Sequence, residues 1–316
     1  MKTVFLDAKG LDELNLSGLH KVCGPMKIYQ KSQPVEVASR IETAEIVILN
    51  KVKMTRELLD NAKNLRLIAV VATGTDCVDL AACRDGGITV VNCRAYGTAS
   101  VAQHIFTSIL ALSTSLIQYH EAVRSGRWQQ SDQFCFLEYP ITELCGKKLG
   151  IVGFGTLGKG VAKLAEAFGM EILVAARPGL RDDTRPSLAE ILPQIDVLTL
   201  HCPLTSETTH LIGKKELSMM KSTAILVNGA RGGIVDEAAL AEALKNGEIG
   251  GAAVDVLTKE PPVDGNPLLD EELPNLLVTP HIAWASVEAR QRILDQTAEN
   301  IAAFLGGEQL RVVEAS

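Results

Sequence analysis

The sequence predicts an α/β protein made of two doubly wound parallel-sheet domains, and three observations lead to that prediction. Short apolar runs bounded by polar residues or glycine, such as TVFLD near the N-terminus, alternate with helical patterns. This alternation is typical of parallel sheets whose strands are joined by right-handed helical crossovers. A second series of strands starts after residue 146, and 316 residues exceed what one hydrophobic core usually holds.

Four apolar runs predict the strands of the first sheet: TVFLD, AEIVILN, LRLIAVVA and GITVVN. A long helical stretch from Ser100 to Ser125 follows. Its apolar residues surround most of the helix, so it is buried or packs against a partner. The last helix runs from about Val287 to Gly306. We therefore predict a domain of residues 97–285, inserted into a domain formed by residues 1–96 and 286–316, with a substrate cleft between the two.

The composition argues against several classes of protein. Apolar residues make up 47% and charged residues 22%, a balance typical of a globular chain. The net charge of −7, with dispersed Lys and Arg residues, argues against a nucleic-acid partner. The apolar run at the N-terminus ends at Asp7, too early for a signal peptide, and no segment has the length of a membrane span. We expect a cytoplasmic protein without a membrane partner.

The seven cysteines form no C-x-x-C pair and lack the spacing of metal ligands. They are expected to be reduced, mostly buried thiols, and no metal site is predicted.

A glycine-rich loop predicts a dinucleotide site. Gly153, Gly155 and Gly158 form G-x-G-x-x-G between the strand LGIV and a helix. The first glycine permits a tight turn, the second lets the backbone approach a pyrophosphate, and the third allows the helix to pack closely on the strand. The helix N-terminus offers N–H groups to the anion. Three glycines alone also fit a structural turn, but the strand before them and the helix after them favour the cofactor.

The stretch about twenty positions further on predicts which dinucleotide is preferred. It reads Val174-Ala-Ala-Arg177-Pro178, so the carboxylate that would bind the ribose hydroxyls is missing and an arginine follows. A guanidinium binds a 2′-phosphate, whereas a carboxylate would repel it. We predict that NADP(H) is preferred. The alternative is that Arg177 is a solvated surface residue and that NAD(H) serves as well.

Charged side chains follow three of the later strands, in the segments NGARGGIVDE (228–237), AVDVLTKEPP (253–262) and TPHIAWAS (279–286). Residues just beyond the carboxyl ends of parallel strands surround the ligand crevice, so Arg231, Asp255, Glu260 and His281 are expected to meet there. Taken singly, Arg231 and Glu260 also fit an ordinary ion pair and His281 a packed histidine.

With these segments, and with ATGTDCVDLAACRDGGITVVN (72–92), VAQH (101–104) and HCPLT (201–205), the chain resembles the D-isomer-specific 2-hydroxyacid dehydrogenases over nearly its whole length. The resemblance implies a Rossmann cofactor domain inserted in a flavodoxin-like substrate domain. It also implies hydride transfer between a nicotinamide and a small 2-oxo or 2-hydroxy acid.

The resemblance assigns three catalytic residues. His281 becomes the acid/base, since an imidazolium can give the proton that the reduced carbonyl oxygen needs. Glu260 becomes its partner, which orients the ring and stabilises its positive charge. Arg231 binds the substrate's carboxylate and polarises its carbonyl through paired hydrogen bonds.

The resemblance also places the substrate's carboxylate at the loop Thr73, Gly74 and Thr75, with Asn50 and Lys51 at its border. It places the nicotinamide carboxamide at Asp255. The remaining cofactor contacts that it implies are Thr156, Leu157, Cys202, Pro203, Thr208, Gly229, Ala230, Arg231 and His281. Without the resemblance, Cys202 is read as a buried structural thiol.

Within the family, the sequence HIAW at 281–284, NKV at 50–52 and the segment DGNPLL resemble the glycerate dehydrogenase and hydroxypyruvate (glyoxylate) reductase branch. This favours hydroxypyruvate or glyoxylate as substrate. A D-lactate or phosphoglycerate specificity, or a non-enzymatic dinucleotide-sensing corepressor, is the alternative. The long apolar helix and the resemblance predict a homodimer whose interface lies on the cofactor domain.

Overall fold

The computed structural model describes residues 1–180, 182–269, 273 and 275–314. The chain divides into two compact units. Unit 1 comprises Met1–Gly97 and Ala285–Ser316, and unit 2 comprises Thr98–Trp284. The predicted borders, after residues 96 and 285, each lie one residue away from these. That unit 1 binds the substrate and unit 2 the cofactor stays a prediction.

In the described part of unit 1, five parallel strands form one sheet in the order β2-β1-β3-β4-β5. This is the flavodoxin-like order. The strands are β1 (Thr3–Phe5), β2 (Met26–Ile28), β3 (Ile46–Leu49), β4 (Leu67–Val70) and β5 (Thr89–Asn92). The helices are α1 (Ser17–Cys23), α2 (Pro34–Ile41), α3 (Arg56–Asn61), α4 (Leu80–Asp85) and α11 (Val287–Leu305).

Helices cover both faces of this sheet. Val37 and Ile41 of α2, Leu59 of α3 and Ala82 of α4 share one buried apolar cluster with residues of the strands. On the other face α11 contacts α1, β4 and β5. Strands buried on both faces read as continuous apolar runs, which is why four of the five were predictable from the sequence. The short strand β2 was missed because its residues are only partly buried.

In the described part of unit 2, six parallel strands form one sheet in the order β11-β10-β9-β8-β6-β7. The strands are β6 (Lys148–Val152), β7 (Glu171–Val174), β8 (Val197–Leu200), β9 (Ile225–Asn228), β10 (Gly251–Val254) and β11 (Leu276–Val278). The helices are α5 (Thr98–Ser113), α6 (Leu116–Arg124), α7 (Thr156–Ala167), α8 (Leu188–Ile191), α9 (Lys214–Met219), α10 (Glu237–Lys245) and the 3₁₀ helix η1 (Pro267–Leu269).

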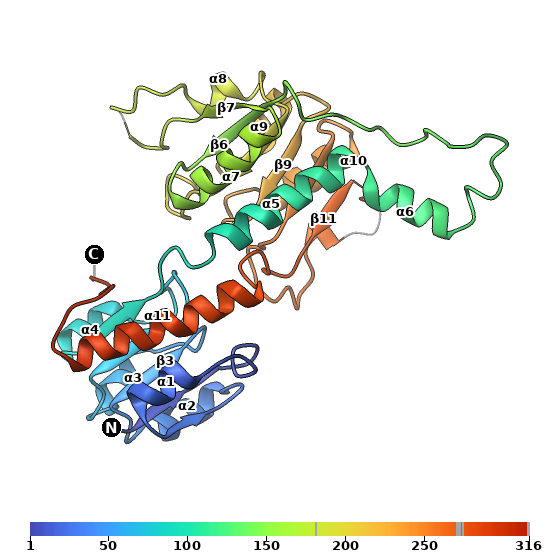
Figure 1. Ribbon diagram of the computed structural model, residues 1–316. Coiled ribbons are helices and arrows are strands. Elements are labelled where there is room, and N and C mark those ends of the chain that lie inside the picture. The colour runs from blue at the N-terminus through green and yellow to red at the C-terminus, as the bar shows by residue number, and fades with distance from the viewer. Residues whose placement is uncertain (181, 270–272, 274, 315–316) are drawn as a thin grey trace. The chain divides into compact units, whose positions relative to one another are not determined.

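Alternate strand residues of unit 2 pack into two apolar clusters, one on each face of the sheet. One cluster joins Ile151 and Val227 to α5 and α7, which lie side by side (Figure 1). The other joins Val152 and Leu226 to α8, α9 and α10. Two parallel sheets, each covered on both faces by helices, confirm the predicted fold class.

The prediction of one helix from Ser100 to Ser125 was wrong. The chain forms α5 and α6, which are bent by 61° at the break between them. The hydroxyls of Ser113 and Thr114 donate to the carbonyls four residues earlier, and Ser115 adopts a left-handed conformation with φ of 49° while its hydroxyl donates to Pro140. Hydroxyl side chains that bond to the backbone in this way compete with the continuing helix.

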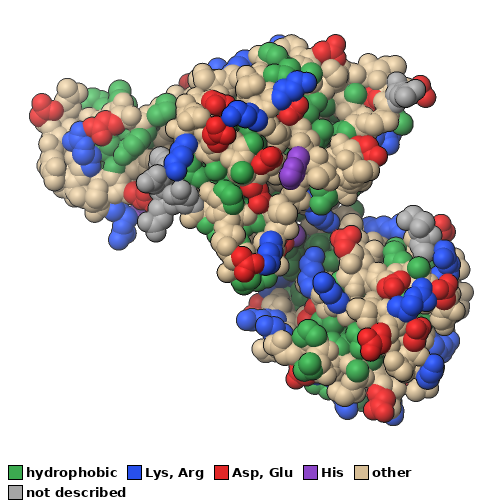
Figure 2. Space-filling view, turned by 180° about the vertical axis from the view of Figure 1, so that it is seen from behind, with side chains coloured by type: hydrophobic (Ala, Val, Ile, Leu, Met, Phe, Trp, Pro, Cys, Tyr) green, Lys and Arg blue, Asp and Glu red, His purple; other side chains and the backbone are tan. Residues whose placement is uncertain are grey.

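Among the described residues no single helix is long and apolar enough to cross a membrane, although α5 and α6 pass that test as a bent pair by length and composition only. Helix α6 and the chain after it extend away from the sheet of unit 2 (Figure 1). Lys and Arg side chains are interspersed with Asp and Glu on the visible face of each unit (Figure 2).

Candidate active site

The glycine loop after β6 leaves space for a ligand at its second glycine. Gly153 has φ of +91°, and a Cβ there would lie 2.6 Å from the backbone nitrogen of Cys202. A Cβ on Gly158 would lie 2.3 Å from the carbonyl oxygen of Gly153. These two glycines are therefore required by packing within the chain. A Cβ on Gly155 would have no neighbour within 4 Å, so Gly155 borders open space.

Gly155 is also the N-cap of α7, and among the described residues no side chain caps that helix end. The first N–H groups of a helix need acceptors, and an anion supplies them. The site lies where the chain order reverses, between the neighbouring strands β6 and β8, which is where doubly wound sheets bind ligands. Thr156 and Leu157 begin α7 and lie beside this opening. The residues present therefore fit a dinucleotide pyrophosphate.

The loop after β8 starts against the glycine loop, where Cys202 lies next to Gly153. The Thr208 hydroxyl donates to the Pro203 carbonyl at 2.7 Å and accepts from the Thr205 N–H at 2.7 Å, which holds the loop in shape. Cys202 is buried and carries a free thiol, whose pKa is raised by burial. A thiol with a raised pKa is a poor nucleophile, in agreement with the structural reading of this cysteine.

His201 follows β8 and is half-buried. Its Nε2 lies 3.0 Å from the hydroxyl of Thr199, and its buried Nδ1 has no partner among the described residues. Burial lowers the pKa of His201 to about 4. The imidazole is therefore neutral at physiological pH.

The strand end of β7 carries no carboxylate, as predicted, but a loop brings one to the backbone of Arg177. Asp183 belongs to the following loop and not to the strand end, and it accepts a hydrogen bond from the N–H of Arg177 at 2.9 Å. Its side chain also pairs with Arg185, and this hydrogen bond holds the pKa of Asp183 well below its usual range. The sequence argument searched only the strand end, whereas the loop brings this carboxylate back. The Arg177 side chain forms no hydrogen bond within the described residues, so its guanidinium can still meet a ligand.

The structure brings His281 and Glu260 together. His281 Nδ1 lies 2.7 Å from Glu260 Oε2, and Glu260 Oε1 accepts from the Leu257 N–H at 2.9 Å. Because Nδ1 faces the carboxylate, it carries the proton in that bond and Nε2 is left to meet a substrate. His281 itself has φ of +56°, a conformation that non-glycine residues seldom adopt.

Arg231 comes from the loop after β9. Gly232 lies so close to the loop before Glu260 that a Cβ there would be 2.0 Å from the Leu257 carbonyl oxygen. Arg231 is exposed, and its guanidinium donates to the Ala230 carbonyl at 2.7 Å. No ion pair between Arg231 and Glu260 occurs within the described residues, so the ordinary ion pair considered above is not formed.

The two residues before Arg231 are fixed by packing. A Cβ on Gly229 would lie 2.6 Å from Ile105, and the N–H of Ala230 donates to the Asn228 side chain at 3.1 Å.

Asp255 is only 4% exposed, and its carboxylate is occupied by the chain itself. It accepts from the Thr279 hydroxyl at 2.5 Å and from the N–H groups of Ile282 and Ala283, each at 2.9 Å. Its predicted contact with the nicotinamide carboxamide stays a prediction. The observed contacts show a second task, which is to hold the loop that contains His281.

The predicted substrate residues of unit 1 lie after β3 and β4. The backbone N–H groups of Asn50 and Lys51 donate to Asp7, and the Thr73 hydroxyl donates to the Cys93 carbonyl at 2.9 Å. Within the part of the chain that the structure describes, the N–H groups of Gly74 and Thr75 have no hydrogen-bond acceptor. Such N–H groups suit a carboxylate ligand.

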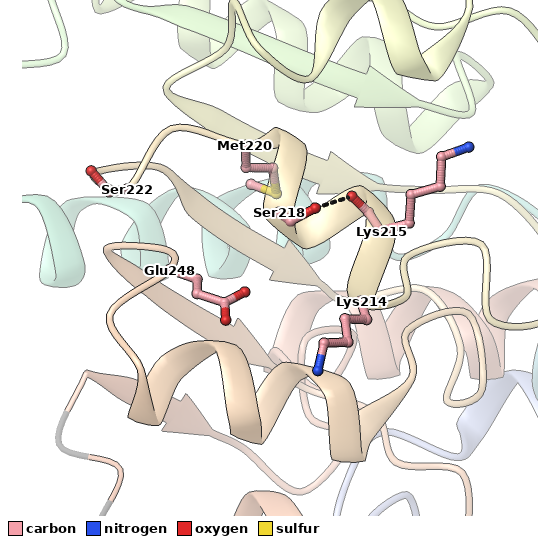
Figure 3. Close-up of a pocket in the computed structure, with 6 residues that line it drawn as sticks. All are labelled: Lys214, Lys215, Ser218, Met220, Ser222 and Glu248. Carbon is pink, nitrogen blue, oxygen red and sulfur yellow. Dashed lines mark hydrogen bonds between the residues drawn. The ribbon is translucent and has the colours of Figure 1, made fainter.

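A shallow hollow of about 720 Å³ contains none of the predicted site residues. It is lined by Lys214, Lys215, Ser218, Met220, Ser222 and Glu248. Figure 3 shows that these side chains do not converge, and Lys215 points away from the others. We therefore assign no part of the predicted active site to this hollow. Among the described residues no group of three or more His, Cys, Asp or Glu side chains could hold a metal ion.

Comparison with known proteins agrees with this geometry. Residues 106–283 match the family described as D-isomer specific 2-hydroxyacid dehydrogenase, NAD binding domain. The chain is 48% identical to a glycerate dehydrogenase of Methylorubrum extorquens over 99% of both proteins, and 37% identical to a hydroxypyruvate reductase of Blautia hydrogenotrophica, again over 99% of both.

A solved structure, that of an NADPH-dependent glyoxylate/hydroxypyruvate reductase from Sinorhizobium meliloti in complex with NADP and malonate, superposes with a TM-score of 0.80. It is 28% identical, and the match covers 99% of this chain and 96% of that one. The resemblance predicted from the sequence is therefore confirmed, and the chain belongs to the D-isomer-specific 2-hydroxyacid dehydrogenases, a family of oxidoreductases.

Proposed function

We propose that the enzyme reduces hydroxypyruvate or glyoxylate to the corresponding 2-hydroxy acid, with NADPH preferred over NADH. The observation that carries the proposal is the His281–Glu260 pair, whose 2.7 Å contact leaves the other ring nitrogen for the substrate. The names of the relatives support the substrate class, because they include glycerate dehydrogenase, hydroxypyruvate reductase and glyoxylate reductase.

The reaction adds a hydride and a proton across the carbonyl group of the 2-oxo acid. When bound, the reduced nicotinamide supplies the hydride to C2. His281 in its protonated form gives the proton from Nε2 to the carbonyl oxygen, while Glu260 accepts from Nδ1–H and fixes the ring. Arg231 binds the planar oxygens of the substrate and stabilises the charge that develops on the carbonyl oxygen. In the reverse direction His281 takes the proton from the hydroxyl.

The N–H groups of Gly74 and Thr75, together with Thr73 and Lys51, are our proposed contacts for the substrate's carboxylate. They lie in unit 1, in loops after β4 and β3.

Replacing His281 by Ala tests the proposal. We expect kcat for hydroxypyruvate to fall about 100- to 10,000-fold, the range for a lost general acid, with the dissociation constant of the cofactor little changed. His20→Ala, which removes an exposed histidine of α1, is the matched control and should leave kcat unchanged. A panel of 2-oxo acids of increasing chain length identifies the substrate. If His281→Ala keeps wild-type activity, or if no member of the panel is reduced, the proposal is wrong.

The cofactor preference is tested separately. Arg177 follows β7 with its guanidinium available, and we propose that it binds the 2′-phosphate of NADPH. Asp183 holds the Arg177 backbone and is itself paired with Arg185, so it does not oppose the phosphate as a lone carboxylate would. We expect a higher kcat/KM with NADPH than with NADH, and Arg177→Gln should remove most of the difference. An equal or higher kcat/KM with NADH would contradict the preference.

We further propose a homodimer in which the projecting segment of unit 2 contacts a second copy. This segment, residues 116–141, exposes large apolar side chains: Leu116, Ile117, Trp128, Phe134, Leu137 and Ile141. Phe134 is 89% exposed, and apolar side chains are visible on the segment in Figure 2. Clusters of this kind mark protein interfaces. Sedimentation at micromolar concentration should give a dimer, and F134D combined with L137D should give a monomer; a wild-type monomer would refute the proposal.

A further inference from the structure

Three polar side chains, His104, Thr279 and Asp255, are linked by hydrogen bonds next to the His281 segment. The proposed reaction gives no role to His104 or Thr279. His104 belongs to α5, Thr279 follows β11 and Asp255 follows β10. His104 Nε2 lies 3.1 Å from Thr279 Oγ1 and 3.7 Å from Asp255 Oδ1, and Thr279 Oγ1 lies 2.5 Å from that same oxygen. The three side chains also line one small internal cavity of unit 2.

The direction of each hydrogen bond follows from the available protons. An ionised carboxylate only accepts, and the Asp255 oxygens receive the Thr279 hydroxyl and the N–H groups of Ile282 and Ala283. The single proton of the Thr279 hydroxyl is used in this bond. Thr279 must then accept from His104, so His104 carries a proton on Nε2.

The hydrogen bonds from His104 through Thr279 to Asp255 end at the segment that positions His281, the proposed acid. The two N–H groups that Asp255 receives belong to the residues directly after His281. The N–H of His281 donates to the Asp255 carbonyl at 2.7 Å, and the His281 carbonyl accepts from the Trp284 indole at 2.9 Å. A left-handed conformation at a non-glycine residue persists only where the surrounding contacts hold it.

We propose that His104 and Thr279 are positioning residues, which hold the Asp255 carboxylate and, through it, the backbone that aims His281 at Glu260. The proposal rests on the proposed function of His281. Neither residue touches the reacting atoms. Loss of the Thr279 hydroxyl removes a donor from Asp255, and loss of the His104 donor leaves the Thr279 hydroxyl without the contact that orients it. Either change lets the segment 281–283 shift, and a misplacement of about 1 Å at an acid can reduce a rate about 100-fold.

Two matched pairs of variants test the positioning role. Thr279→Val keeps the shape and removes the hydroxyl, whereas Thr279→Ser restores it. His104→Gln keeps a donor near the position of Nε2, whereas His104→Leu removes it. We expect kcat to fall about 10- to 100-fold in the Val and Leu variants and to recover to within a few-fold of wild type in the Ser and Gln variants, with the dissociation constant of the cofactor unchanged.

Rescue by the conservative variant separates positioning from general destabilisation. In a positioning role kcat follows the presence of the hydrogen-bond donor, while KM and the dissociation constant of the cofactor stay near their wild-type values. Ser108→Ala is the matched control, because Ser108 lines the same cavity but its hydroxyl donates to the His104 carbonyl within α5.

The outcomes distinguish the two proposals. A wild-type enzyme that reduces no 2-oxo acid overturns the proposed function. An active wild type whose Val and Leu variants keep kcat within twofold overturns the positioning role. If Thr279→Val does not fold, the His104→Gln and His104→Leu pair decides: equal kcat in the two folded proteins would also overturn it.

Discussion

The two units differ at the point of the sheet where the chain order reverses. In unit 1 the chain order reverses between β1 and β3, and in unit 2 between β6 and β8. At such a point the loops leave the sheet on opposite sides and open a crevice that takes ligands. In unit 1 the chain fills its own crevice, whereas in unit 2 it leaves the crevice open.

The side chain that fills unit 1 is Asp7, which follows β1. Its carboxylate accepts from the N–H groups of Asn50 and Lys51, each at 2.7 Å, and of Val52 at 3.2 Å, all in the loop after β3. In unit 2 the corresponding loop after β6 carries glycines, and Gly155 borders open space at an uncapped helix end. Each unit thus has a set of backbone N–H donors at this point of its sheet. In unit 1 the Asp7 carboxylate accepts from them, whereas in unit 2 the N–H groups at the start of α7 are left for an anionic ligand.

The difference between the two units can be removed by placing a carboxylate in the glycine loop of unit 2. Gly155→Asp places a negative charge where the pyrophosphate would bind, and the protein should still fold because a Cβ there meets nothing within 4 Å. Two like charges about 4 Å apart repel by several kcal/mol near a protein surface, so we expect the dissociation constant of NADPH to rise at least about 100-fold. Fluorescence titration with NADPH measures it.

Gly155→Ala is the control for the added side chain. It brings a methyl group without charge and should weaken the cofactor by much less than Gly155→Asp. Gly153→Ala would not serve, because its Cβ would collide with the backbone of Cys202 at 2.6 Å and disturb the fold. Unchanged NADPH affinity in Gly155→Asp would show that the opening is not the cofactor site.

The converse change, Asp7→Ala, empties the crevice of unit 1. Three N–H groups lose their acceptor, and we expect the free energy of unfolding to fall by about 1–3 kcal/mol. Because these N–H groups hold the loop with Lys51, KM for the 2-oxo acid should rise while NADPH affinity stays the same. Urea unfolding and steady-state kinetics measure the two effects. A variant as stable as wild type would mean that solvent replaces the carboxylate at no cost.

The sequence was most informative where a pattern carries the structure. Continuous apolar runs predicted the buried strands, and the context of the glycines predicted the loop at Gly153 and Gly155. The positions of His281 and Glu260 at one edge of the sheet followed from the order of charged residues after strands, since parallel strands bring their carboxyl ends together. Their pairing was implied by the family resemblance, and the structure shows it.

Features that depend on contacts between distant residues were not predictable. The helix break at Ser115 was missed because the apolar pattern continues through it. Asp183 was missed because a loop, and not the strand, brings it to Arg177. His104 on an apolar helix reads as a packed histidine, and only the fold shows that Thr279, 175 residues away, is its partner.

The last difference between the two crevices is in their dependence on pH. His201, directly after β8, is half-buried, and desolvation lowers its pKa from 6.5 to about 4. The unfolded chain therefore binds a proton at this residue near pH 6.5, whereas the folded protein binds it only near pH 4. Unfolding takes up a proton between these values, so the stability that the neutral histidine contributes is present above pH 6.5 and is lost as the pH falls.

His201→Gln removes this titration and keeps an amide near Thr199. We expect the free energy of unfolding of the wild type to fall more than that of the variant between pH 7 and pH 4.5, by up to about 3 kcal/mol. Urea unfolding at both pH values measures it, and equal losses in the two proteins would contradict the assignment. Asp7 should show the opposite sign. Burial raises its pKa, so the stability of the wild type relative to Asp7→Asn should fall as the pH rises through the folded-state value, although the N–H contacts to the carboxylate remain.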